Sequence, residues 1–111
     1  MAYHNRIKTG MLKVDASLIG EYGAVSREVV EQMVSGVMRS FGTNCGIATS
    51  GIAGPGGGTG EKPVGTTWIA VATAERIYSR KYLFGGSRER IITQASCSAL
   101  QLLRQLILNV I

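Results

Sequence analysis

Apolar residues recur three or four positions apart in two long stretches of the chain, which is the spacing of one face of a helix. In the first, Ser26 supplies an N-cap and Gly42 an end, and the predicted core face consists of Val30, Met33, Val34, Val37 and Phe41. In the second, which Ser87 caps and which runs to about Asn109, the stripe consists of Ile92, Ala95, Ala99, Leu102 and Leu106. A shorter helix is expected from Asp15 to Glu21, with Gly23 as its end.

Short apolar runs bounded by turn residues predict two buried strands, at 45–50 and 66–74. The first lacks alternation, which is typical of a strand that helices cover on both faces. A third strand at 76–84 follows after Glu75 alone and should pair antiparallel with its predecessor. Its charged residues favour an edge or half-exposed position. Together these elements predict an α/β domain of three layers, with a small mixed sheet and helices on both faces.

A glycine-rich stretch, residues 51–65, joins the first two predicted strands. Its composition ends strands and helices rather than extending them, with prolines at 55 and 63 and glycines at 54, 56, 57, 58 and 60. Backbone N–H groups without side chains can approach a ligand closely, so the stretch is either a binding loop or a mobile connection. Neither the P-loop pattern nor the dinucleotide fingerprint fits it. Ser50 adds a hydroxyl and Lys62 a cation.

Composition limits the class of protein. The 111 residues are 45% apolar and 17% charged, which indicates one folded domain. Apolar runs stay shorter than the ~18 residues that span a bilayer, and the first residues have no signal-peptide core, so a cytoplasmic location and no membrane are expected. The two cysteines, Cys45 and Cys97, lie far apart without metal-ligand neighbours, and we expect reduced, buried thiols and no metal site.

The net charge of +5 suits either nucleic acid or a phosphorylated small molecule. Basic and aromatic residues interleave only in the third strand, at Arg76, Tyr78, Arg80, Lys81 and Tyr82. Alternation along a strand favours a solvated face there, and no recognised nucleic-acid motif is present. The sequence therefore argues against nucleic acid as the partner.

The glycine-rich stretch and its surroundings resemble the C-terminal domain of the competence/damage-inducible protein CinA, a family that includes stand-alone nicotinamide mononucleotide amidases. The segments that carry the resemblance are Ser50 to Thr59, Glu61 to Gly65, Ala2 to Asn5 with Lys8, Gly23 to Ser26, and Phe84 to Arg88. They extend over nearly the whole chain. The resemblance implies a C–N hydrolase that converts the carboxamide of a pyridine nucleotide to a carboxylate and ammonia, without metal or cofactor.

The resemblance also implies site residues. Lys8 would be the base, supported by Tyr3 and Ser50, and Asn5 would lie at the site. The nucleotide would be held by Arg88, Lys62 and the backbone of Gly54, Gly56, Gly57 and Gly58. Two positions depart from the family pattern: Ser50 stands where the family has a threonine, and Ser87 stands where an aspartate is usual. An arginine fork suits phosphate geometry.

The family's domain begins with a further strand and helix and a Glu-Ser-Cys-Thr-Gly-Gly motif, whose serine is the nucleophile. These 111 residues contain no such motif. The chain thus reads as one domain, 1–111, without its first strand and helix. A truncated start, a loss of catalysis and a substitute nucleophile all remain open, as does a non-catalytic nucleotide-binding or oligomerisation module. The wide apolar face of the last helix and an uncovered sheet edge predict a homo-oligomer.

Overall fold

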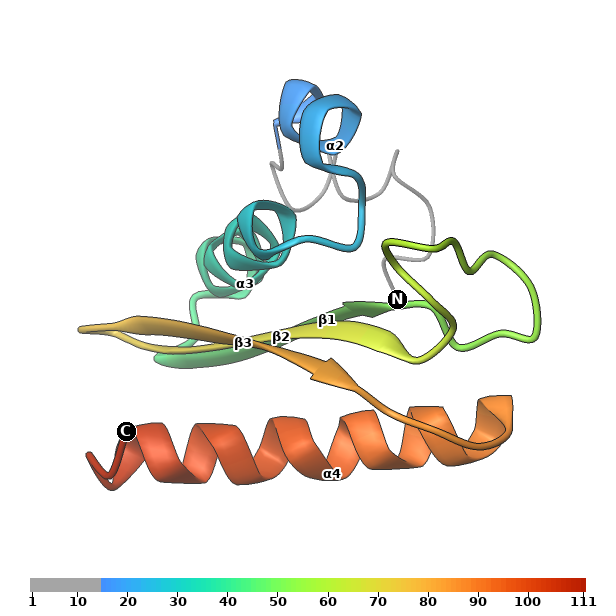
Figure 1. The fold of residues 1–111 in the computed structure, drawn as a ribbon. Coiled ribbons are helices and arrows are strands. Elements are labelled where there is room, and N and C mark those ends of the chain that lie inside the picture. Colours follow the sequence, from blue (N-terminus) through green and yellow to red (C-terminus); the bar gives the residue numbers. More distant parts are fainter. Residues whose placement is uncertain (1–14) are drawn as a thin grey trace.

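The structure, a computed structural model, describes residues 15–111. In this part of the chain the helices are α2 (Ala16–Tyr22), α3 (Arg27–Phe41) and α4 (Arg88–Ile107), and the strands are β1 (Cys45–Gly51), β2 (Thr66–Thr73) and β3 (Ile77–Leu83). They form three layers (Figure 1): α2 and α3 lie on one face of the sheet, and α4 lies along the other. The predicted α/β/α layering is confirmed.

Each described helix begins at a residue whose side chain caps it. Asp15, Ser26 and Ser87 have extended backbones and accept hydrogen bonds from the N–H groups of Ser17, Val29 and Arg90. Gly42 ends α3 in the left-handed conformation that glycine adopts most easily. The helix boundaries therefore follow from local chemistry, and the predicted ones agree with the structure to within two residues at every end.

The sheet has the order β1-β2-β3, and both pairs of neighbouring strands are antiparallel. A mixed sheet was expected, but among residues 15–111 no parallel pair occurs, because each connection leads the chain straight back beside the strand it has left. β2 is the central strand and is almost wholly buried. β3 is a half-exposed edge, as predicted. β1 is the other edge of the described sheet, and helices lie against both its faces as expected, because Ala48 packs in the cluster of α3 and Ile47 packs against the cluster of α4.

Two apolar clusters fill the spaces between the layers. The cluster between α3 and the sheet consists of Val29, Val30, Met33, Val34, Ala48, Ala70 and Ala72. The cluster between α4 and the sheet consists of Ile69, Val71, Ala99, Leu102 and Leu106. Ile91 is buried at the start of α4, whereas Ile92, which the predicted stripe included, is 47% exposed. Phe41 is 66% exposed, because it lies at the last turn of α3 beyond the edge of the cluster.

Both cysteines are exposed and free, so the prediction of buried thiols was wrong. Cys45 is the first residue of β1, where the edge strand leaves the loop after α3. Cys97 lies in α4 and is exposed, whereas Ala99 and Leu102 of the same helix are buried against the sheet. Of the helices in residues 15–111, none is long and apolar enough to cross a bilayer.

Candidate functional site

The connection between β1 and β2, residues 52–65, is called the glycine loop below. Backbone hydrogen bonds close its base: Gly65 donates to the Ile52 carbonyl at 2.7 Å, and Ile52 donates to the Thr66 carbonyl at 2.9 Å. Near its tip, Thr59 N–H donates to the Lys62 carbonyl at 2.9 Å, and the Thr59 hydroxyl accepts from Lys62 N–H at 3.0 Å. The loop is therefore a defined structure with its own internal contacts.

Two glycines are required by close backbone approaches at the base of the loop. Gly65 has φ +98°, and a Cβ there would lie 2.0 Å from the Phe84 carbonyl oxygen. A Cβ on Gly58 would lie 2.7 Å from the backbone nitrogen of Val64. Of the glycines predicted to hold a ligand, Gly56, Gly57 and Gly58 are exposed, whereas Gly54 is buried. The exposed three present a stretch of backbone without side chains, which a ligand can approach directly.

Ser50 lies at the end of β1, immediately before the glycine loop, and only 8% of it is exposed. Its hydroxyl donates to the Ala24 carbonyl at 2.8 Å. Ala24 belongs to the segment that runs from the last residue of α2 to the N-cap of α3, residues 22–26, which is called the corner below. Ser50 thus joins the end of β1 to a segment that lies 26 residues earlier in the chain.

Lys62 reaches the same corner from the glycine loop. Its ammonium donates to the Tyr22 carbonyl at 2.9 Å. Tyr22 is the last residue of α2, where the helix leaves carbonyl groups without partners in the helix and where a positive charge is favoured. Lys62 and Ser50 are therefore brought together on one small backbone segment, as the prediction of a shared site requires.

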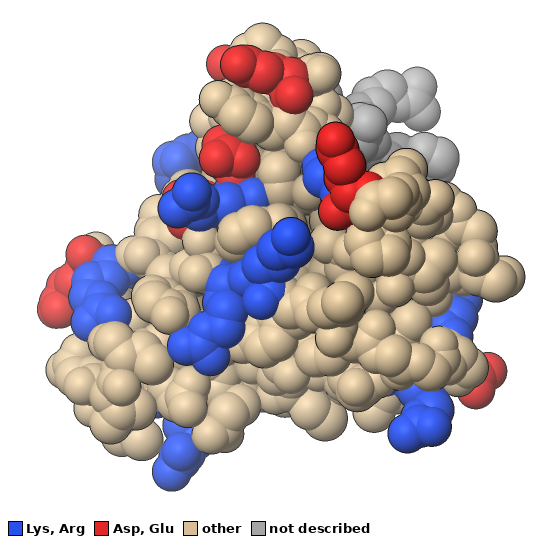
Figure 2. Space-filling model, in the orientation of Figure 1, with Lys and Arg blue, Asp and Glu red and all other residues tan. Residues whose placement is uncertain are grey.

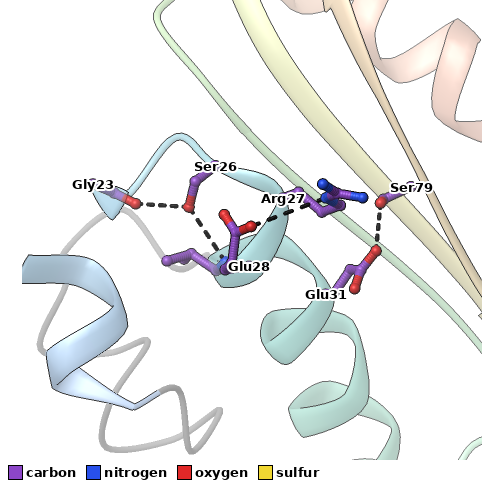
Figure 3. A network of polar contacts seen from close by, with 7 residues as sticks. Gly23, Ser26, Arg27, Glu28, Glu31 and Ser79 are labelled. Atoms are coloured by element: carbon purple, nitrogen blue, oxygen red, sulfur yellow. Dashed lines mark hydrogen bonds and ion pairs between the residues drawn. The ribbon is translucent and has the colours of Figure 1, made fainter. Parts of the chain in front are cut away.

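The corner has its own polar contacts (Figure 3). The Ser26 hydroxyl donates to the Gly23 carbonyl at 2.9 Å and accepts from Val29 N–H at 3.3 Å. Further along α3, Glu31 accepts a hydrogen bond of 2.5 Å from the hydroxyl of Ser79 on β3. α3 is thus fixed to the corner at one end and to the sheet along its length.

Arg88, the first residue of α4, contacts the other limb of the glycine loop. Its guanidinium donates from Nη1 to the Gly54 carbonyl at 3.1 Å. Figure 1 shows the start of α4 and the glycine loop at the same end of the molecule. The loop thus carries one cation, Lys62, and is held by a second, Arg88. Each uses one donor on a backbone carbonyl and carries further donors.

The remaining predicted site residues, Tyr3, Asn5 and Lys8, lie outside the described residues. Sequence reasoning missed the two carbonyl groups, of Tyr22 and Ala24, that receive Lys62 and Ser50. Backbone carbonyls leave no mark in a sequence, and the only available signal was the Gly23-Ala24-Val25-Ser26 segment of the family resemblance. In residues 15–111, His, Cys, Asp and Glu form no group of three that could hold a metal ion.

Other charged groups are used within the fold. Arg80 lies over the Tyr78 ring at 5.4 Å and donates to its hydroxyl at 3.0 Å, and this hydrogen bond raises the pKa of the guanidinium. Figure 2 shows a short run of basic side chains across the middle of one face, while several of the other Lys and Arg groups on this face lie beside acidic ones. A depression lined by Glu89, Arg90, Thr93 and Gln94 lies on α4, apart from the contacts described above.

Residues 1–107 match the model of the CinA C-terminal domain. A CinA-like protein from Cytophaga hutchinsonii is 45% identical over 105 residues, which are 95% of this chain and 25% of that protein. The nicotinamide-nucleotide amidohydrolase PncC of Pseudomonas putida is 44% identical over 106 residues, which are 96% of this chain and 66% of the relative.

Solved structures show the same fold. The competence/damage inducible protein CihA from Agrobacterium tumefaciens superposes with a TM-score of 0.92 at 34% identity, over 95% of this chain and 65% of that chain. The chain thus spans about a quarter of the CinA-like protein and about two thirds of the amidohydrolase and of the solved structure.

Proposed function

Because this chain belongs to the CinA C-terminal domain family, we propose that it acts on nicotinamide mononucleotide, as a nicotinamide-nucleotide amidase does. The reaction consumes one water molecule: the bond between the carboxamide carbon and its nitrogen breaks, and nicotinate mononucleotide and ammonia are released. The proposal is supported by two relatives named nicotinamide-nucleotide amidohydrolase, which are 44% and 42% identical to this chain.

The observation that carries the proposal is the glycine loop between two cations. Lys62 ties one limb of the loop to the Tyr22 carbonyl, and Arg88 holds the Gly54 carbonyl in the other limb. Both side chains have donors left for a phosphate. The exposed backbone at Gly56 to Gly58 lies in the sequence between Gly54, whose carbonyl Arg88 holds, and Lys62. We propose that the phosphate of the nucleotide binds against this loop, with the guanidinium of Arg88 as its bidentate partner.

In the chemical step, Lys8 is proposed as the base. Amide hydrolysis needs a nucleophile, a group that removes its proton and donors that stabilise the oxyanion. Ser50 is proposed as a supporting hydroxyl, but its contact with the Ala24 carbonyl indicates that it acts by holding the corner in place rather than by attacking the substrate. Tyr3 and Asn5 complete the proposed set.

A second candidate is a nucleotide-binding module without turnover. The observation in its favour is that the Ser50 hydroxyl, the predicted site hydroxyl within residues 15–111, donates to the Ala24 carbonyl and so serves the fold. Such a module would keep the glycine loop, Lys62 and Arg88 and would bind the nucleotide without releasing ammonia.

Ammonia release from nicotinamide mononucleotide separates the two candidates. The assay compares the 111-residue protein with Lys8→Ala, and with Lys81→Ala as a control for loss of an exposed lysine on β3. Turnover by the parent and the control but not by Lys8→Ala supports the amidase. Saturable binding without ammonia release in any of the three supports the binding module. If the parent shows neither binding nor turnover, both candidate functions are contradicted.

A further inference from the structure

Within residues 15–111, α2 is held to the rest of the molecule by few contacts. It has seven residues and none of them is buried, and Leu18 and Ile19 pack only partly buried against the cluster of α3. An isolated helix of this length is not stable in water, so its position depends on the groups that fix its ends. At the N-terminal end, Asp15 N–H donates to the Gln32 side chain at 2.8 Å.

The C-terminal end of α2 is fixed by side chains from the candidate site. Lys62 of the glycine loop holds the Tyr22 carbonyl, and Ser50 of β1 holds the Ala24 carbonyl. Within the corner itself, Gly23 N–H donates to the Ile19 carbonyl at 2.9 Å and Ser26 holds the Gly23 carbonyl. The corner is therefore internally bonded and is attached to the site by two donors.

Of these two donors, only Lys62 stands on the loop that is exposed to a ligand. Its ammonium has three N–H donors, and the contact with Tyr22 uses one of them. An anion that takes a second donor is held by the same side chain that holds α2. Binding on the glycine loop also fixes the rotamer of Lys62, so the entropy of ordering this long side chain is lost once for both contacts.

We infer that Lys62 is a positioning residue that couples α2 to occupancy of the glycine loop: it tethers the helix in the free protein, and a phosphate-bearing ligand on the loop tightens that tether. The tether is inferred only from the hydrogen bond between the Lys62 ammonium and the Tyr22 carbonyl. The identity of the ligand rests on the proposed function.

The tether is tested without ligand, by hydrogen–deuterium exchange in residues 16–26. Lys62→Met keeps the length of the side chain and removes the donors, and Lys81→Met makes the same change at an exposed position of β3. We expect about tenfold faster exchange in residues 16–26 for Lys62→Met, unchanged exchange in α4, and no change for Lys81→Met. Lys62→Arg, which keeps a cationic donor, should restore part of the protection. Exchange in Lys62→Met equal to that of the parent would overturn the tether.

The coupling is tested by repeating the experiment with nicotinamide mononucleotide and with nicotinamide riboside, which lacks the phosphate. The nucleotide should slow exchange of residues 16–26 in the parent and not in Lys62→Met, and the riboside should have no effect on them. Protection confined to the glycine loop would overturn the coupling and leave the proposed function standing. Failure of the nucleotide to bind the parent would contradict the proposed function and the coupling together, while the tether is still decided by the ligand-free comparison.

Discussion

At the scale of single residues, the base of the glycine loop depends on the absence of a side chain, most of all at Gly65. Gly65 combines a positive φ of +98° with a backbone neighbour, the Phe84 carbonyl, 2.0 Å from where a Cβ would stand. A flexible side chain could move away from a new methyl group, but a carbonyl in the backbone after β3 cannot. The close approach is also what lets Phe84 N–H donate to the Gly65 carbonyl at 3.0 Å.

Gly65→Ala should therefore lower the free energy of unfolding by about 3 kcal/mol, from the strained φ and the clash together. Gly60→Ala is the matched control, because a Cβ on Gly60 would meet no atom within 4 Å and its φ is not positive. The control should change stability by less than about 0.5 kcal/mol. Urea unfolding of the two variants checks this, and equal stabilities would contradict the account of the loop base.

A second prediction at this scale concerns the pKa of the Asp15 carboxylate. The hydroxyl and the backbone N–H of Ser17 both donate to its carboxylate, and these hydrogen bonds hold the pKa of Asp15 below its usual value of 3.8. Since the folded pKa is lower than the unfolded one, the carboxylate stabilises α2 above about pH 4, and this contribution is lost as the pH falls through the folded pKa. An NMR titration should place its midpoint below 3.8; a midpoint at or above that value would show that the Ser17 contacts are absent in solution.

Part of the candidate site could be predicted from individual residues in the sequence. Ser50 and Lys62 stood out in the sequence as a hydroxyl and a cation beside a glycine-rich stretch, whereas Arg88 was identified only through the family resemblance. Their partners could not be predicted, because all three donate to backbone carbonyls, which every residue type carries. That these residues lie beside the glycine loop could thus be predicted, whereas the contacts by which they hold the corner and the loop could not, and their part in ligand binding stays a prediction.

At the scale of elements, caps account for the accuracy of the helix boundaries. Ser26 shows why: its hydroxyl satisfies the Val29 N–H, one of the donors that the start of a helix leaves without a partner, and also holds the Gly23 carbonyl. Both contacts are local, so the sequence contains them. Strand pairing is not local, and whether β1 or β2 lies at the centre of the sheet depends on residues far apart in the chain.

Ser26→Ala should lower the free energy of unfolding by about 1–2 kcal/mol, because it removes the cap of α3 and leaves the partly buried Gly23 carbonyl without that donor. Ser96→Ala serves as the control, since the Ser96 hydroxyl is exposed and donates only to the Ile92 carbonyl within its own helix; its cost should stay below about 0.5 kcal/mol. Denaturant titration of both variants measures the difference. A Ser26→Ala protein as stable as Ser96→Ala would mean that the cap contributes little.

At the scale of the whole molecule, the outer face of α4 bears on the prediction of a homo-oligomer. Leu100 and Val110 are each 65% exposed, and Ile107 is 53% exposed. Ile92, Leu100, Leu103 and Ile107 follow one another at helical spacing beside the buried face of α4, so the apolar surface is continuous with the core. Self-association through this face of α4 remains a prediction, with a second copy of the chain as the proposed occupant.

Sedimentation velocity over a range of concentrations tests this. The parent should sediment as a species heavier than the 11.8 kDa monomer, and Leu100→Glu should shift it to the monomer because a charge in an apolar contact is costly. Gln101→Glu is the matched control, since it adds the same charge at the neighbouring exposed position without removing an apolar side chain. A parent that is monomeric at every concentration would contradict self-association through α4.

The central claim, that the glycine loop with Lys62 and Arg88 holds a nucleotide, is tested most directly by calorimetric titration of the parent and of Arg88→Gln with nicotinamide mononucleotide. The account predicts saturable binding by the parent and at least about tenfold weaker binding by Arg88→Gln, from loss of a charge-assisted contact to the phosphate. The parent should bind nicotinamide riboside no more tightly than Arg88→Gln binds the nucleotide. Equal affinities of the parent for nucleotide and riboside, or no binding by the parent, would contradict the claim.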